Sequence, residues 1–126
     1  MPRLARPRVF VTQPVAASAL QRLRGFADVD LNPDSTHIMS RGELCAAVSD
    51  HEILLCLLQD HVDVVVVSAN PKLAAIASMK ITPDGIDVAA ASSRGIPVTV
   101  IPPMVTEATA DLHFGLLIAV ARRGPQ

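Results

Sequence analysis

The four histidines are the first residues to examine for chemistry, because imidazole acts as a general acid or base near neutral pH and binds metal ions. None of them forms an HExxH motif or another paired spacing typical of a metalloenzyme. Each is explained more simply as a surface or core residue. We therefore expect no catalytic residue and no metal ligand among these histidines, which are His37, His51, His61 and His113.

The two cysteines, Cys45 and Cys56, lie 11 positions apart, with no CxxC motif and no histidine at the spacing of a zinc ligand. A GxSxG nucleophile motif is also absent from the sequence. We expect both cysteines to be small, buried, apolar side chains in a reducing cytosol, and not a disulfide or a metal site.

The glycines are too far apart to form a GxGxxG or GxxxxGK loop, so the sequence predicts no dinucleotide-phosphate site within the chain. Asp84 and Asp87 could form a pair of carboxylates for acid–base work. Asp87, however, precedes a short helical segment that begins at Val88, where its side chain would cap the first turn. We favour the capping role.

Length and charge limit the remaining possibilities. The chain of 126 residues is half apolar and has a net charge of −1, which suits one globular domain and gives no reason to expect nucleic acid or an anionic membrane as a partner. The longest apolar stretch, Leu112–Ala121, is shorter than the ~20 residues that cross a bilayer. No secretory signal pattern is found at the start of the chain. We expect a cytoplasmic protein.

Strand-like and helical segments alternate along the chain. A helix capped by Ser40 extends to Val48, and Glu43 completes a capping box. The other predicted helices are Val15–Phe26, Asp87–Arg94 and Thr106–Arg123, and the predicted strands are Arg8–Thr12, Val29–Leu31, Glu52–Leu58, Lys72–Ser78 and Pro97–Val100. This alternation predicts an α/β fold, a doubly wound parallel sheet with strand order near 2-1-3-4-5.

One segment is ambiguous. Val62–Ser68 contains four consecutive valines, whose branched side chains are stiff in a helix, so the segment taken alone predicts a strand. Its alternative is a short helix held by tertiary packing.

Several separated motifs in the last third of the chain follow one another in a recognisable order. They are Ile81–Ala91, Arg94–Val98 and Thr106–Arg123. Together they resemble the N-terminal part of D-2-hydroxyacid dehydrogenases, a family that includes glyoxylate and hydroxypyruvate reductases, and the likeness extends over essentially the whole chain. The resemblance implies a flavodoxin-like fold, and it favours the helix for Val62–Ser68.

The resemblance also implies the site residues. Backbone amides of Ile81 and Thr82 would bind the substrate carboxylate, and Ile81 and Thr109 would contact the cofactor, NAD or NADP. The family has Gly-aromatic-Asp-Asn where this chain has Thr82-Pro83-Asp84-Gly85. Because Pro83 has no N–H and threonine disfavours positive φ, we expect this loop to have a different shape.

In the family, a Rossmann domain follows and supplies the nucleotide fingerprint and the catalytic arginine, glutamate and histidine. The resemblance therefore implies that residues 1–105 form a flavodoxin-like substrate-side domain, and that residues 106–126 form an interdomain helix truncated before that Rossmann domain. We expect part of an NAD(P)-dependent oxidoreductase that acts on the CH–OH group of small 2-oxo or 2-hydroxy acids, inactive as this fragment alone. The alternative is a stand-alone flavodoxin-like binding or interaction module.

The predicted terminal helix, Thr106–Arg123, has large apolar side chains on all sides. Such a helix needs a partner to cover it. We therefore expect the isolated chain to form a homodimer.

Overall fold

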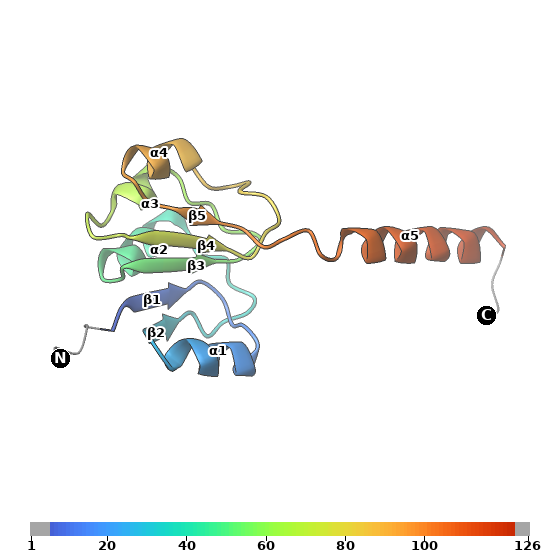
Figure 1. The fold of residues 1–126 in the computed structure, drawn as a ribbon, viewed down its shortest axis with the longest axis horizontal. Coiled ribbons are helices and arrows are strands. Elements are labelled where there is room, and N and C mark those ends of the chain that lie inside the picture. Colours follow the sequence, from blue (N-terminus) through green and yellow to red (C-terminus); the bar gives the residue numbers. More distant parts are fainter. Residues whose placement is uncertain (1–5, 123–126) are drawn as a thin grey trace.

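Five parallel strands form one sheet in the computed structural model, which describes residues 6–122 (Figure 1). Its strand order is β2-β1-β3-β4-β5, which confirms the predicted doubly wound, flavodoxin-like arrangement. All four strand pairs are parallel. The strands are β1 (Arg8–Val11), β2 (Asp28–Leu31), β3 (Ile53–Cys56), β4 (Ala75–Ser78) and β5 (Val98–Thr99).

Five helices connect and follow the strands. They are α1 (Ala17–Arg24), α2 (Arg41–Ser49), α3 (Val64–Ser68), α4 (Val88–Ser93) and α5 (Thr106–Ala121). Helices α2, α3 and α4 pack in series on one face of the sheet, and α1 packs beside β2. The core divides accordingly, because alternate strand residues point to opposite faces. Leu54 and Cys56 of β3 pack under α2 to α4, while Val9 and Val11 of β1 belong to the second, smaller cluster.

Two local predictions depended on caps, and a third concerned the valine-rich segment. Ser40 and Glu43 form the complete capping box of α2, and the Asp87 side chain accepts a hydrogen bond from the Ala90 amide at the start of α4. Val64–Ser68 is a helix, as the family resemblance predicted and β-propensity did not. Asp63 caps it by accepting hydrogen bonds from the Val65 and Val66 amides, and burial of two valines on the core outweighs the propensity.

Several predicted elements are shorter in the structure, among them one strand and one helix that begin later than predicted. The strand expected from Lys72 begins only at Ala75, because the Asn70 side chain accepts a hydrogen bond from the Lys72 amide and closes a turn there. The helix expected from Val15 begins at Ala17, with Ala16 as its N-cap.

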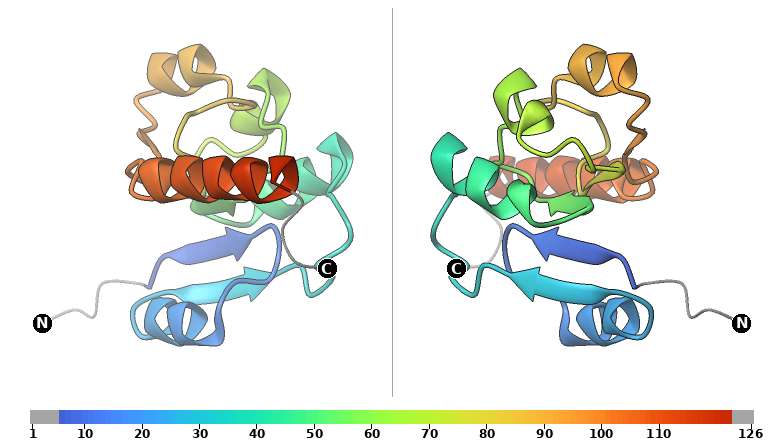
Figure 2. Two further views of the ribbon diagram at one scale, coloured as in Figure 1. Left: turned by 90° about the vertical axis from the view of Figure 1, so that its right-hand side faces the viewer. Right: turned by 90° about the vertical axis from the view of Figure 1, so that its left-hand side faces the viewer.

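Helix α5 extends away from the sheet (Figures 1 and 2). All of its residues are exposed. It ends at Ala121, so Arg122 occupies the C-cap and not the last turn as predicted, and Arg123 lies outside the described residues. Among residues 6–122, no helix is both long and apolar enough to span a membrane.

Candidate substrate site at the carboxyl edge of the sheet

The loops that follow β1, β3 and β4 meet at the carboxyl edge of the sheet. The strand order changes direction between β1 and β3, and in open α/β sheets ligands bind outside the carboxyl ends at such a switch point. Thr12 follows β1 directly, and its hydroxyl donates a hydrogen bond to Oδ2 of Asp60 in the loop after β3. The Leu57 amide donates to the same oxygen at 2.7 Å. This buried network fixes the first two loops to each other.

The loop after β3 is joined in turn to the β4–α4 loop, residues 79–87. The Val62 amide donates to the Gly85 carbonyl at 2.7 Å, and the Asp87 amide donates to the Val62 carbonyl at 2.8 Å. Gly85 has φ of +83°, and a Cβ there would lie 3.0 Å from the carbonyl oxygen of Asp60. The close approach of the two loops and the positive φ therefore favour glycine at this position.

Within the β4–α4 loop, Lys80 Nζ donates to the Asp84 carbonyl at 2.6 Å, and the Thr82 hydroxyl donates to the Asp84 carboxylate. The Ile86 amide donates to the Pro83 carbonyl at 3.0 Å. The amides of Ile81 and Thr82, by contrast, donate to no acceptor within residues 6–122. The loop thus carries two N–H groups without an acceptor and a lysine ammonium, which are groups of the kind that bind anions.

The structure brings two of the three predicted site residues together. Ile81 and Thr82 are adjacent and exposed on the β4–α4 loop. Thr109 lies in the first turns of α5, where its carbonyl accepts from His113 Nδ1, and no contact between Thr109 and Ile81 occurs in the described part of the chain. The cofactor role of these two residues stays a prediction.

Sequence reasoning missed three residues of this edge, namely Thr12, Asp60 and Lys80. Each one follows or nearly follows a strand, and in a parallel sheet all such residues collect at one edge. Polar residues within four positions after β1, β3 and β4 were therefore the signal that could have identified them. Their mutual contacts join segments 48 residues apart, in the case of Thr12 and Asp60, and no local pattern shows that.

Among the histidines and cysteines, His51 and Cys56 are buried in the folded chain. His51 is buried, and its two ring nitrogens lie 2.6 Å from the Ala47 carbonyl and 2.9 Å from Asp30 Oδ2. The hydrogen bond from His51 lowers the pKa of Asp30 below its ordinary value. Cys56 is buried in the core, and burial raises the pKa of its thiol to about 11, so it is not a nucleophile at neutral pH.

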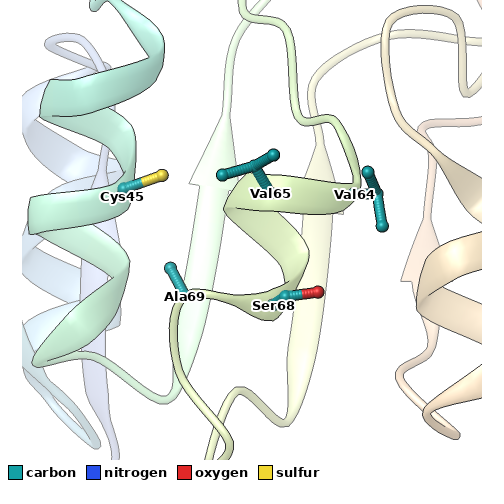
Figure 3. Close-up of a pocket in the computed structure, with 5 residues that line it drawn as sticks. All are labelled: Cys45, Val64, Val65, Ser68 and Ala69. Carbon is teal, nitrogen blue, oxygen red and sulfur yellow. The ribbon is translucent and has the colours of Figure 1, made fainter.

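An apolar groove of about 530 Å³ lies between α2 and α3, on a different part of the surface (Figure 3). It is lined by Cys45, Val64, Val65, Ser68 and Ala69. Cys45 is only partly buried, which differs from the buried position expected from the sequence. Since none of these side chains is charged, the groove does not suit a small carboxylic acid. The β4–α4 loop remains the better candidate site.

Comparison with known proteins agrees with the fold. The family model for the catalytic domain of D-isomer specific 2-hydroxyacid dehydrogenases matches residues 9–115. The chain is 38% identical to the glyoxylate reductase of Thermofilum pendens over 120 residues, which are 95% of this chain and 35% of that enzyme. It is 40% identical to the glyoxylate reductase of Korarchaeum cryptofilum over 118 residues, again 35% of that enzyme. The chain thus spans only about a third of the length of these relatives.

Solved structures give the same relationship. A protein from Thermus thermophilus superposes with a TM-score of 0.80 at 37% identity, over 92% of this chain and 37% of its own. An NADPH-dependent glyoxylate/hydroxypyruvate reductase from Sinorhizobium meliloti, in complex with NADP and malonate, gives a TM-score of 0.67 at 28% identity, over 91% of this chain and 34% of its own. Because the family model matches most of its length, the chain belongs to the D-isomer specific 2-hydroxyacid dehydrogenases and corresponds to their catalytic domain.

Proposed function

We propose that this chain is the substrate-side part of an NAD(P)-dependent reductase of small 2-oxo acids, of the glyoxylate or hydroxypyruvate type. The observation that carries the proposal is the pair of open amides, Ile81 and Thr82, beside the ammonium of Lys80 at the carboxyl edge. A 2-oxo acid presents a carboxylate, and converging N–H donors with a nearby cation bind that group well. The names of the relatives supply the substrate class.

In this proposal the β4–α4 loop holds the substrate by its carboxylate and leaves the keto carbon directed away from the sheet. The Ile81 side chain, 44% exposed, gives an apolar surface that would exclude water from one side of a nicotinamide ring. Thr109 would contact the same cofactor from α5. NAD or NADP, when bound, supplies the hydride, and the residues of this chain bind and orient the acid.

The proposal assigns residues 1–105 to the substrate-side domain and residues 106–126 to an interdomain helix. Hydride transfer needs the nicotinamide, the carbonyl carbon and a proton donor held within ~3–3.5 Å of one another. Lys80 and Asp84, charged residues of the β4–α4 loop, are already bonded within it, and in the family the acid/base histidine belongs to the Rossmann domain. We therefore expect the 126-residue chain alone to be inactive.

Two measurements test the proposal. The amide signals of Ile81 and Thr82 should shift on titration with glyoxylate, while the signal of Lys72, at the opposite edge, should not. The chain should show no oxidation of NADH or NADPH above background with glyoxylate or hydroxypyruvate. Turnover within a few hundredfold of a complete glyoxylate reductase would show that the catalytic groups lie in this chain.

A second candidate, a stand-alone binding module without catalysis, is favoured by one observation. The core under α2, α3 and α4 contains eleven buried residues, all from this chain, as expected for a domain that folds by itself. Glyoxylate binding at the loop with no NAD(P)H binding by any longer form of the protein would favour this candidate over the reductase.

A further inference from the structure

We infer that Lys80 is a positioning and specificity-determining residue, which sets both the shape and the charge of the β4–α4 loop and so controls how tightly the loop binds a 2-oxo acid. The inference rests on the proposed function. It adds a residue that the sequence motifs do not mark, because Lys80 precedes the pair of amides that the resemblance identifies.

Three hydrogen bonds hold Lys80 in place. Its amide donates to the Ser78 hydroxyl at 3.1 Å, and its carbonyl accepts from the Ile101 amide at 2.9 Å. Its ammonium then reaches forward to the Asp84 carbonyl at 2.6 Å. The backbone and the side chain of one residue thus close a ring around Ile81, Thr82 and Pro83. This ring restrains the backbone of the two residues with open amides and uses neither amide.

The composition of the loop explains why such a tether is needed. Pro83 has no N–H with which to close a turn, so the side chain of Lys80 supplies the cross-loop hydrogen bond instead. Asp84 adds a carboxylate to a loop that has to accept an anion. The ammonium of Lys80 offsets this negative charge, and without it the loop would repel the substrate that its amides attract.

The charge of Lys80 lies close enough to act on a bound carboxylate. The ammonium contacts Asp84, which is two residues from Thr82, and two residues span at most ~7 Å of extended chain. This distance is shorter than the Debye length of ~8–10 Å at physiological ionic strength. A Cβ at Gly85 would lie 3.0 Å from the Asp60 carbonyl oxygen, 3.1 Å from Lys80 Nζ and 3.5 Å from His61 Nδ1, so a backbone carbonyl and the imidazole of His61 also face this point.

The test uses the isotope-labelled 126-residue chain and oxalate, a planar dianion that resembles a 2-oxo acid. The affinity is measured from the amide shifts of Ile81 and Thr82. Lys80→Met should weaken oxalate binding about tenfold, the scale of one charge-assisted hydrogen bond. Lys80→Arg keeps the charge and should restore binding to within about threefold of the wild type. Lys72→Met is the matched control, since Lys72 is the only other lysine and lies at the opposite edge, and it should bind as the wild type does.

Ionic strength separates the effect of charge from that of structure. Raising it from about 0.02 M to about 0.5 M should weaken oxalate binding in the wild type and in Lys80→Arg, and much less in Lys80→Met. If Lys80→Met does not fold, as judged by thermal unfolding, a salt-independent wild-type affinity overturns the inference. Equal oxalate affinity in a folded Lys80→Met variant overturns it as well and leaves the proposed site intact. If the wild-type amides do not respond to oxalate, the proposed site and the inference both fail.

Discussion

Gly85 is the residue at which the backbone tolerates the least change. Its φ of +83° is unfavourable for residues with a Cβ, and a Cβ there would lie 3.0 Å from the carbonyl oxygen of Asp60. Gly85→Ala should therefore lower the free energy of unfolding by about 1–2 kcal/mol, the cost of a left-handed conformation. Gly85→Asn should cost less, because asparagine tolerates this region and the family has asparagine here. Urea unfolding measures both variants.

Gly42→Ala is the matched control for that measurement. Gly42 lies in the first turn of α2, and a Cβ at this position would meet nothing within 4 Å, so alanine should raise stability by about 0.5–1 kcal/mol. If Gly85→Ala is as stable as the wild type, the two loops at the carboxyl edge are not held in the contact that the structure shows.

Asp60 is a buried carboxyl group, 2% exposed, whose Oδ2 accepts hydrogen bonds from Thr12 and Leu57, while Oδ1 has no partner within the described residues. Asp60→Ala removes the acceptor of two buried donors and should cost about 1–3 kcal/mol. Asp60→Asn should cost less, since the amide oxygen can still accept both bonds. Denaturant midpoints compare the two variants, with Thr12→Val as the control that deletes one donor. An asparagine variant no more stable than the alanine variant would contradict this account.

At the scale of residues, the sequence predicts hydrogen bonds between residues close together in the chain. It does not predict contacts between distant segments. Asp87 and Glu43 were identified correctly because a cap and its helix lie within four residues of each other. The contacts of Asp60 with Thr12, and of Gly85 with Val62, depend on which strands become neighbours in the sheet. A single sequence contains no signal for such pairs until the sheet order is known.

At the scale of elements, the Ser40–Glu43 capping box of α2 can be tested by measuring stability as a function of pH. Hydrogen bonds from the backbone amide and then the hydroxyl of Ser40, followed by the ring of His37, lower the pKa of Glu43 from 4.5 to about 2. A depressed pKa in the folded state means that the cap stabilises the protein above pH 4.5 and that this contribution is lost as the pH falls to about 2. Glu43→Gln should therefore be less stable than the wild type at pH 7. The difference should disappear as the pH falls through that window.

Urea midpoints at several pH values between 2 and 7 measure this difference, a window that follows from the two pKa values. His37 is the control, because His37→Ala removes the side chain that contacts Glu43 Oε1 and leaves both bonds from Ser40 in place. His37→Ala should narrow the pH range over which the stabilisation by Glu43 is lost, but it should not abolish that stabilisation. If the urea midpoints of Glu43→Gln and the wild type instead differ equally at every pH, the charge of Glu43 does not cause the difference.

Helix α3 shows where local propensity fails for an element. Four valines in sequence favour a strand, yet the chain forms a helix over Val64–Ser68. Asp63 caps its first turn, and Val66 and Val67 are buried against α2 and the sheet. The family resemblance predicted this helix, while the residues alone did not, because its stabilisation comes from packing.

At the scale of the whole molecule, the alternation of strands and helices predicted a parallel sheet with helices on both faces, and the observed strand order agrees with that prediction. The surroundings of α5 could not be predicted in the same way. The apolar side chains of a helix indicate that another surface buries them, but the helix sequence does not identify that surface. In the structure its large side chains are between 44% and 77% exposed, namely Leu112, Phe114, Leu116, Leu117, Ile118 and Val120.

Leaving these six side chains half covered by water forfeits about 5–9 kcal/mol, taking half of the ~1.5–3 kcal/mol expected for burying each one. We therefore predict that the isolated chain self-associates through α5, because a second copy offers the same apolar surface and the contact closes with two-fold symmetry. The double variant Leu116→Gln, Leu117→Gln should shift the dimer towards monomer. Since both leucines are more than half exposed, it should leave the unfolding of the monomer unchanged.

Sedimentation of the wild type, the double variant and Phe26→Gln separates α5 from apolar exposure in general. Phe26 is 67% exposed and lies outside α5, next to α1, so its replacement should leave the dimer intact. Thermal unfolding at two protein concentrations gives an independent measure, because the melting temperature of a dimer that dissociates on unfolding rises with concentration. A wild-type chain that sediments as a monomer at ~100 µM, with a melting temperature independent of concentration, would show that α5 does not associate with a second copy. In that case the apolar surface of the helix would need a different partner, and the nucleotide-binding domain of a longer chain is the one that the proposed function supplies.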